Sequence, residues 1–127
     1  MNCPCQPSTK YNICCGRYHL GTLYPPTAEA LSRARHSAYV LNKPIYIYNT
    51  WDESTRPPLE AVKLLMQEKY IDFKIIHKDM GLEEHDIGMV TYLATYNSSN
   101  DDPITYKELS LFKRNKGKWI FHKSERK

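Results

Sequence analysis

Residues 3–16, CPCQPSTKYNICCG, contain all four cysteines of the 127-residue chain, and the rest of the sequence follows this stretch as one body. Two cysteines lie one residue apart, and after an eight-residue gap two more are adjacent. If the intervening residues turn back, four thiolates meet at one centre, which suits the tetrahedral coordination of zinc. Four protein ligands leave no position for a water nucleophile. The spacing therefore predicts one structural zinc ion bound by Cys3, Cys5, Cys14 and Cys15.

A pair of disulfides is the competing interpretation of the same cysteines, with three possible connectivities. Adjacent Cys14 and Cys15 bond to each other only with strain, and a bond between Cys3 and Cys5 closes a cramped ring, so only cross-pairings remain. Those pairings need an oxidising compartment. The chain begins MNCPC, with no apolar run of signal-peptide length. We therefore expect zinc in a cytoplasmic protein, and disulfides, free thiols and an iron–sulfur centre are the alternatives.

The C-x-C-x8-C-C spacing, which ends in Gly16, resembles the SEC-C zinc motif found at the tail of the SecA translocase. The four cysteines match the ligands of that motif one for one, and Tyr11 lies where the family often has an aromatic residue. The small Gly-Ser-Gly turn of the family is replaced here by residues 6–8, Gln-Pro-Ser. The resemblance implies a small zinc knuckle at this end of the chain.

The composition indicates one soluble body behind the knuckle. The formal charge of +4 is too weakly basic to indicate nucleic-acid binding by itself. No run approaches the ~18 apolar residues of a transmembrane helix, so we expect no membrane association. Pro25 and Pro26 mark a linker, which predicts a knuckle over residues 1–24 and a second domain over residues 25–127.

Two segments have the apolar spacing of amphipathic helices. The first begins after Thr27, a plausible N-cap, and is expected to reach about Leu41. Arg35 lies on its apolar stripe, where its stem either covers apolar surface or forms a buried ion pair at the floor of a pocket. The second helix is expected over residues 59–69. Between them, residues 43–50, KPIYIYNT, have the composition of a strand.

The remaining sequence has the period of β-strands. Alternation begins after Tyr70, and three further strands are expected at about residues 87–96, 104–114 and 118–122. A tight hairpin is predicted at residues 115–117, Asn-Lys-Gly. Helices followed by antiparallel strands predict an α+β domain in which the helices pack on one face of a curved sheet.

Several runs along the whole chain resemble the YchJ-like family of uncharacterised bacterial proteins. These are LSRARHSAYV at residues 31–40, TWDESTRP at residues 50–57, and ELSLF followed by GKW within residues 108–119. The resemblance implies a SEC-C knuckle joined to a cone-shaped domain of the nuclear-transport-factor-two-like fold, and it implies that residues 43–50 form a short helix. We adopt the helix. Asp52 stands where relatives usually have a histidine, and Leu111 where they have an arginine.

The cone fold implies a cavity, for which the sequence offers four candidate lining residues: Arg35, Trp51, Tyr106 and Glu108. Glu108 shares a strand face with Tyr106 and Phe112, so its pKa is raised unless a cation is near. We expect Arg35 or Arg33 to be that cation. The ion pair then fixes helix to sheet, and an acid–base role for Glu108 is the alternative. Crowding by Trp51, Tyr106, Phe112 and Trp119 is expected to fill the cavity.

Three functions are compatible with the sequence, and none of them is decided by it. The first is an interaction module that binds a protein partner through the zinc knuckle, with no catalytic residue. The second is a small-ligand-binding domain, or a hydro-lyase- or isomerase-like enzyme, that uses Glu108 in the cone. The third is an RNA- or ribosome-contacting module that uses the basic hairpin at residues 113–118. The five histidines are interpreted as packing or surface residues.

Overall fold

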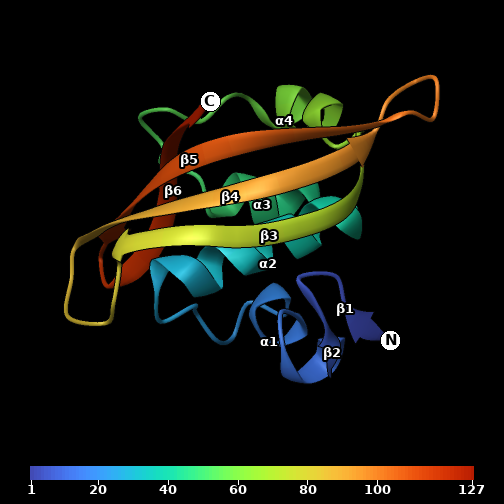
Figure 1. Ribbon diagram of the computed structural model, residues 1–127. Helices are drawn as coiled ribbons and strands as arrows, with labels where there is room; N and C mark the ends of the chain where they lie inside the picture. Colours follow the sequence, from blue (N-terminus) through green and yellow to red (C-terminus); the bar gives the residue numbers. More distant parts are fainter.

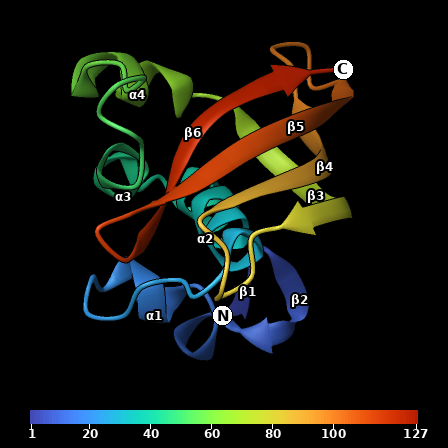
Figure 2. The same cartoon turned by 90° about the vertical axis from the view of Figure 1, so that its left-hand side faces the viewer.

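The strands of the second domain form a curved antiparallel sheet that wraps around a long helix, as a computed structural model of residues 1–127 shows (Figure 1, Figure 2). The predicted α+β fold class is confirmed. The knuckle consists of β1 (Asn2–Cys3), β2 (Gln6–Lys10), the 3-10 turn Tyr11–Ile13 and α1 (Gly16–His19). The body contains α2 (Ala28–Val40), α3 (Pro44–Asn49), α4 (Leu59–Leu65), β3 (Lys69–Met80), β4 (Ile87–Asn97), β5 (Pro103–Asn115) and β6 (Lys118–Arg126).

The sheet is a simple meander, because its spatial order β3-β4-β5-β6 is also the order along the chain. The predicted hairpin is confirmed: Asn115 pairs with Lys118, and the two residues between them have positive φ. Lys116 has φ 52° and Gly117 has φ 81°, as a two-residue hairpin of the favoured hand requires. β6 continues to Arg126, four residues beyond the predicted end.

The pairing of β5 with β6 is interrupted at His122. Leu111 pairs with Lys123 while Phe112 pairs with Phe121, so His122 is an extra residue in β6. The preceding loop runs beside the same point, because Phe121 exchanges backbone hydrogen bonds of 2.8 Å with Thr50 and Asp52. Bulges of this kind redirect a side chain from the regular alternation of a strand. The bulge therefore places His122 beside the loop that carries Asp52.

The helices agree with the expectations except at the end of α4. α2 begins as predicted, because Thr27 Oγ1 accepts a hydrogen bond of 3.0 Å from the Ala30 amide. Strand propensity was wrong for α3, which is a helix as the family resemblance implies. Its Ile47 is fully buried against α2 and α4, and this tertiary packing overrides the local preference. α4 ends four residues before the predicted Lys69, because Lys69 is already paired in the sheet.

Two clusters of apolar side chains hold the helices to each other and to the sheet. One lies between α2 and the sheet and consists of Ala28, Leu31, Val90, Phe112, Trp119 and Phe121. The other joins α2, α3 and α4 and consists of Ala38, Ile47, Val62 and Met66. None of the helices is both long and apolar enough to cross a membrane.

The start of α2 is fixed against the turn between β3 and β4 at very close range. A Cβ atom on Gly88 would lie 2.4 Å from Gly81 Cα and 3.0 Å from Ala28 Cβ. Gly81 also has φ +83° and accepts a hydrogen bond of 2.9 Å from the Ala28 amide. Only glycine fits at either position, so this turn sets how deeply the helix lies in the sheet.

Candidate metal centre and ligand cavity

The four cysteines of the knuckle lie together. All four are buried, and their Sγ atoms lie within 4.8 Å of one another. The Sγ atom of Cys5 is 3.6 Å from that of Cys3 and 3.5 Å from that of Cys14. Zinc–thiolate bonds of about 2.3 Å in a tetrahedron separate the sulfurs by about 3.8 Å. All four thiols are free of disulfides. The donor set therefore fits one tetrahedral metal ion, as the spacing predicted.

Two local features bring the two halves of the cluster together. β1 and β2 pair antiparallel, which turns the chain back after Cys5. Cys14 and Cys15 then lead into α1 at Gly16, where a Cβ atom would lie 2.7 Å from the Tyr11 carbonyl oxygen. A residue with a side chain would push Tyr11 outward and move the second pair of thiols. Gly16 is thus part of the site through its lack of a side chain.

The thiols interact so strongly that their pKa values differ from one another. Hydrogen bonds from Cys15, Cys14 and Cys3 lower the pKa of Cys5 to about 5. Burial and the hydrogen bond to Cys5 raise the pKa of Cys14 to about 11. The hydrogen bond to Cys5 and burial raise the pKa of Cys15 as well. The cluster accommodates one thiolate readily, and four require a cation between them.

The inner side of the knuckle packs on α2. Cys3 Sγ lies 3.5 Å from Ser37 Oγ, and Arg33 donates a hydrogen bond of 3.2 Å to the Cys5 carbonyl oxygen. His19 Nε2 donates to the Ala34 carbonyl oxygen at 2.8 Å, and its Nδ1 lies 2.6 Å from the Tyr11 hydroxyl, so both ring nitrogens are engaged. Ala34 belongs to the same buried cluster as the cysteines. The boundary between residues 24 and 25 stays a prediction.

The outer side of the knuckle leaves apolar side chains in solvent. Leu20 is 80% exposed and Ile13 is 62% exposed. Met1, Leu23 and Tyr24 are also exposed. The apolar surface of these side chains makes no contribution to the core.

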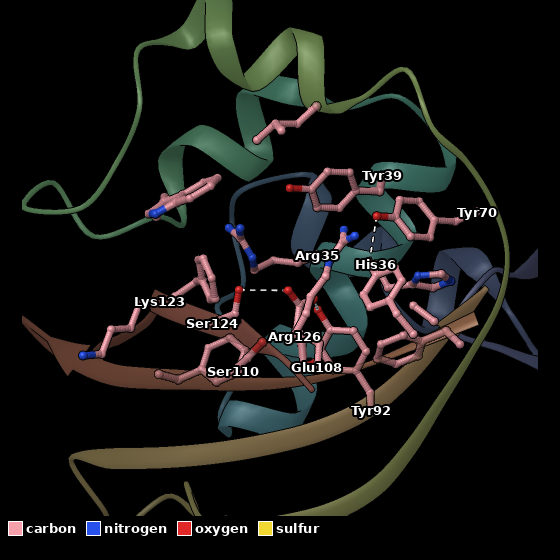
Figure 3. A pocket seen from close by; sticks show the side chains of 18 of the residues that line it. Arg35, His36, Tyr39, Tyr70, Tyr92, Glu108, Ser110, Lys123, Ser124 and Arg126 are labelled. Carbon is pink, nitrogen blue, oxygen red and sulfur yellow. Dashed lines mark hydrogen bonds between the residues drawn. The ribbon is translucent and has the colours of Figure 1, made fainter. Parts of the chain in front are cut away.

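A cavity of about 480 Å³ lies between α2, α4 and the sheet (Figure 3). Arg35, Trp51, Tyr106 and Glu108 all line it, while their role in function stays a prediction. Of the four aromatic residues expected to crowd the cavity, Trp51, Tyr106 and Phe112 line it and Trp119 is buried in the core, and the space stays open. The domain therefore has room for a small molecule.

Arg35 enters this cavity from α2 and is only 6% exposed. Its Nη1 donates to the Ile47 carbonyl oxygen at 2.9 Å and to Thr50 Oγ1 at 2.8 Å. The guanidinium carbon lies 4.5 Å from the centre of the Phe121 ring and 5.2 Å from that of Trp51. Burial lowers the pKa of Arg35. The side chain also ties α2 to the end of α3.

The expected ion pair of Glu108 with Arg35 or Arg33 is wrong. No carboxylate lies within 4.0 Å of the Arg35 guanidinium. Arg33 points to the knuckle instead and pairs with Glu29 at 2.9 Å. Residues two apart on a helix project about 200° apart, so Arg33 and Arg35 face opposite sides.

Glu108 is held by hydroxyl groups rather than by a guanidinium. Its Oε2 accepts a hydrogen bond from the Tyr92 hydroxyl, and its Oε1 accepts one of 2.9 Å from Ser124 Oγ (Figure 3). Burial, with the nearby charge of Glu108, raises the pKa of Tyr92 well above its usual value. Sequence reasoning missed both partners. The contact with Tyr92 could have been predicted from the register of the strands, because Tyr92 lies directly opposite Glu108 on the neighbouring strand.

A second polar group at the cavity was missed entirely. His122 and Thr55 both line the cavity, and His122 Nδ1 lies 2.6 Å from Asp52 Oδ2. Asp52 is 6% exposed, and it also accepts from Lys113 Nζ at 2.8 Å and from the Ser54 amide at 3.1 Å. These hydrogen bonds, from Lys113 first, hold the pKa of Asp52 well below its usual range. His122 Nε2 has no protein partner.

The basic hairpin at residues 113–118 uses its charges within the chain. Lys113 pairs with Asp52, and Arg114 donates to the carbonyl oxygens of Leu82, Glu83 and His85. Lys118 lies 4.2 Å from the centre of the Tyr24 ring. These contacts leave few charges free for phosphates, so the patch is a weak basis for nucleic-acid binding.

Comparisons with known proteins agree with this arrangement. A family model described as "YchJ, middle NTF2-like domain" matches residues 27–124. A UPF0225 protein from Streptomyces coelicolor is 36% identical over 123 residues, which cover 97% of this chain and 94% of that protein. The solution structure of a SEC-C motif-containing protein from Rhodopseudomonas palustris has a TM-score of 0.88 at 26% identity and covers 98% of both chains. The crystal structure of a SEC-C motif-containing protein from Psychrobacter arcticus has a TM-score of 0.82 at 25% identity and covers 97% of this chain and 81% of that one.

Proposed function

This chain belongs to the YchJ family, and from that premise we propose that it is an interaction module whose zinc knuckle presents a surface to a protein partner. The ion is one zinc held by Cys3, Cys5, Cys14 and Cys15. Zinc is favoured because it accepts four thiolates in a tetrahedron and has no redox chemistry that would need an open site. Free, buried thiols at this spacing support a reducing compartment, the cytoplasm.

The observation that carries the proposal is the contrast between the two sides of the knuckle. The metal ligands and the inner side are buried, whereas Ile13 and Leu20 are 62% and 80% exposed. A saturated metal site does no chemistry, so the knuckle contributes shape. A loop that is already fixed by metal loses little conformational entropy on binding, which favours its use as a recognition surface.

The test is a photo-crosslinking experiment in the organism's own cytosol, with the crosslinker placed at Ile13 in the full chain. A discrete adduct is expected from the wild-type background, and Leu20→Asp should abolish it. Ile104→Asp is the matched control, because Ile104 is an exposed apolar residue on β5. Cys14→Ser/Cys15→Ser should also abolish the adduct by releasing the loop.

The crosslinking results that support the proposal differ from those that contradict it. A protein that is captured by wild type and by Ile104→Asp, lost in Leu20→Asp, and then shown to bind as a purified partner supports the proposal. An adduct that survives Leu20→Asp and the double cysteine change contradicts it.

The second candidate function is binding of a small ligand in the cone. The observation that favours it is the cavity of about 480 Å³ into which the buried Arg35 projects without a counter-ion. In the hydro-lyase- or isomerase-like form of this candidate, His122 is a better base than Glu108. Both oxygens of Glu108 already accept hydrogen bonds, while His122 keeps Nε2 free.

Its test is native mass spectrometry of the protein purified from its own cells under gentle conditions. A stoichiometric adduct of small mass that is lost on denaturation supports the candidate. A bare chain, together with no response to any added small molecule, contradicts it.

A further inference from the structure

The buried guanidinium of Arg35 is the unusual feature of the cavity. A cation removed from water is costly unless it is paired or fully hydrogen-bonded. Arg35 has two hydrogen bonds, both from Nη1, and two aromatic faces beside it. Its Nε and Nη2 atoms have no partner in the protein. Neither atom is among the fully buried side-chain atoms that lack a partner, which are Tyr46 Oη and Trp51 Nε1.

Nε and Nη2 form the side edge of a guanidinium, where two N–H bonds run nearly parallel. A carboxylate matches this edge with two parallel hydrogen bonds, which is the strongest and most directional pairing that arginine makes. The edge belongs to a side chain that is anchored at Nη1, so its direction is set before a ligand arrives. The cavity therefore offers a fixed place for one carboxylate group.

The side chains that line the cavity indicate the chemistry of the rest of the ligand. Phe73, Tyr92 and Phe121 are among the rings that line the cavity, and this surface suits an apolar or aromatic body. Glu108 contributes a negative charge to the same space, and its two oxygens already accept from Tyr92 and Ser124. The charged side chains of the lining are Arg35, Lys123 and Arg126 against Glu68 and Glu108, which leaves one net positive charge for a ligand with a single negative group.

We infer that the cavity binds a small organic monocarboxylate, with the carboxylate on the Nε–Nη2 edge of Arg35 and an apolar body against the aromatic wall. This inference deepens the second candidate function and rests on it. It is independent of the partner surface on the knuckle.

The test is calorimetric titration of the full, metal-loaded chain with benzoate, phenylacetate, indole-3-acetate and octanoate. Each acid is compared with its own amide, which has nearly the same shape and no charge. At least one acid is expected to bind at least about tenfold more tightly than its amide, because a hydrogen-bonded charge contributes that much in a desolvated site. Arg35→Met should remove this advantage.

Two further variants keep the test decisive. Arg35→Lys retains the charge and a donor for the Ile47 carbonyl oxygen but lacks the two-pronged edge, so it should also lose about tenfold for the acid, and it carries the test if Arg35→Met does not fold. Arg56→Met is the matched control. Arg56 also covers a tyrosine ring and donates to a backbone carbonyl oxygen, but it lies outside the cavity lining, so its variant should bind as wild type does.

The contrary results fall into two kinds. If acids and amides bind equally, or if Arg35→Lys binds the acid as wild type does, the cavity is a ligand site but the carboxylate inference is overturned. If no acid and no amide binds, the carboxylate inference is overturned, and native mass spectrometry alone decides the second candidate function.

Discussion

Asp52 and His122 lie 70 residues apart in the chain, yet His122 Nδ1 is 2.6 Å from Asp52 Oδ2. The loop after α3 and the bulge in β6 bring the two side chains together, and Lys113 binds the same carboxylate oxygen at 2.8 Å. Asp52 therefore joins the loop to the sheet through charge-assisted hydrogen bonds.

Asp52 is predicted to make the fold sensitive to acid. Because its pKa in the folded state is held well below its ordinary value of 3.8, its contribution to stability is present above that value and is lost as the pH falls further. Wild type should therefore lose stability between about pH 4 and pH 2. Asp52→Asn should be less stable at neutral pH and should lack this part of the pH dependence. Denaturant melts across the range measure it, with the neighbouring exposed Glu53→Gln as control.

His36 predicts a second loss of stability at a higher pH. It is buried on α2, stacked on Phe73 with ring centres 4.4 Å apart, and burial lowers its pKa from 6.5 to about 4. The unfolded chain binds this proton first, so the free energy of unfolding should fall as the pH drops from about 6.5 to about 4, by roughly 3 kcal/mol.

His36→Phe should flatten this part of the stability profile while preserving the stack on Phe73. His77→Phe, a change at an exposed histidine of β3, should leave the fall in place. An unchanged slope in His36→Phe would mean that another group takes up the proton.

Metal analysis is predicted to find one zinc per chain. Removal of the metal should unfold the knuckle and leave the sheet, because the core between α2 and the sheet contains no residue from the knuckle. Hydrogen exchange after chelation should show faster exchange in α2 around Ala34 and Ser37, with β4 and β5 still protected. Cys14→Ser/Cys15→Ser should respond little to the chelator. Loss of the entire strand signal would show instead that the knuckle completes the core.

Glu108 and Tyr92 are predicted to be energetically coupled. Each is a hydrogen-bond partner of the other, so either Glu108→Gln or Tyr92→Phe disturbs the same bond. A double-mutant cycle measured by denaturant unfolding should give a coupling energy on the order of 1 kcal/mol. The coupling between Glu108→Gln and Arg35→Met should be smaller, because these side chains make no direct bond. If instead Glu108 were coupled more strongly to Arg35 than to Tyr92, the two side chains would form an ion pair in solution, contrary to the structure.

The sequence predicted those parts of the molecule that depend on neighbours along the chain. The cysteines lie within 13 residues of one another, and the Thr27 cap and the hairpin at Gly117 are local signals. α3 was predicted by family resemblance only, since its helix depends on where Ile47 packs.

The cavity depended on features that no local pattern contains. Arg35 already lay on the predicted apolar stripe of this helix, but the sequence does not show that its guanidinium binds Ile47 and Thr50 instead of Glu108. The pairing of Asp52 with His122 requires one extra residue in β6, and strand alternation alone does not predict such an insertion.

α2 has the metal knuckle on one side and the cavity on the other. Ala34 and Ser37 contact the knuckle, while Ser32, Arg35 and His36 line the cavity, all within one helix of 13 residues. We therefore expect a molecule that binds Arg35 to bind better when a metal holds this helix in place. By thermodynamic reciprocity the same molecule should then make the metal harder to remove, and by the same factor. The two sites thus report on each other, and zinc release timed with and without a cavity ligand measures their coupling.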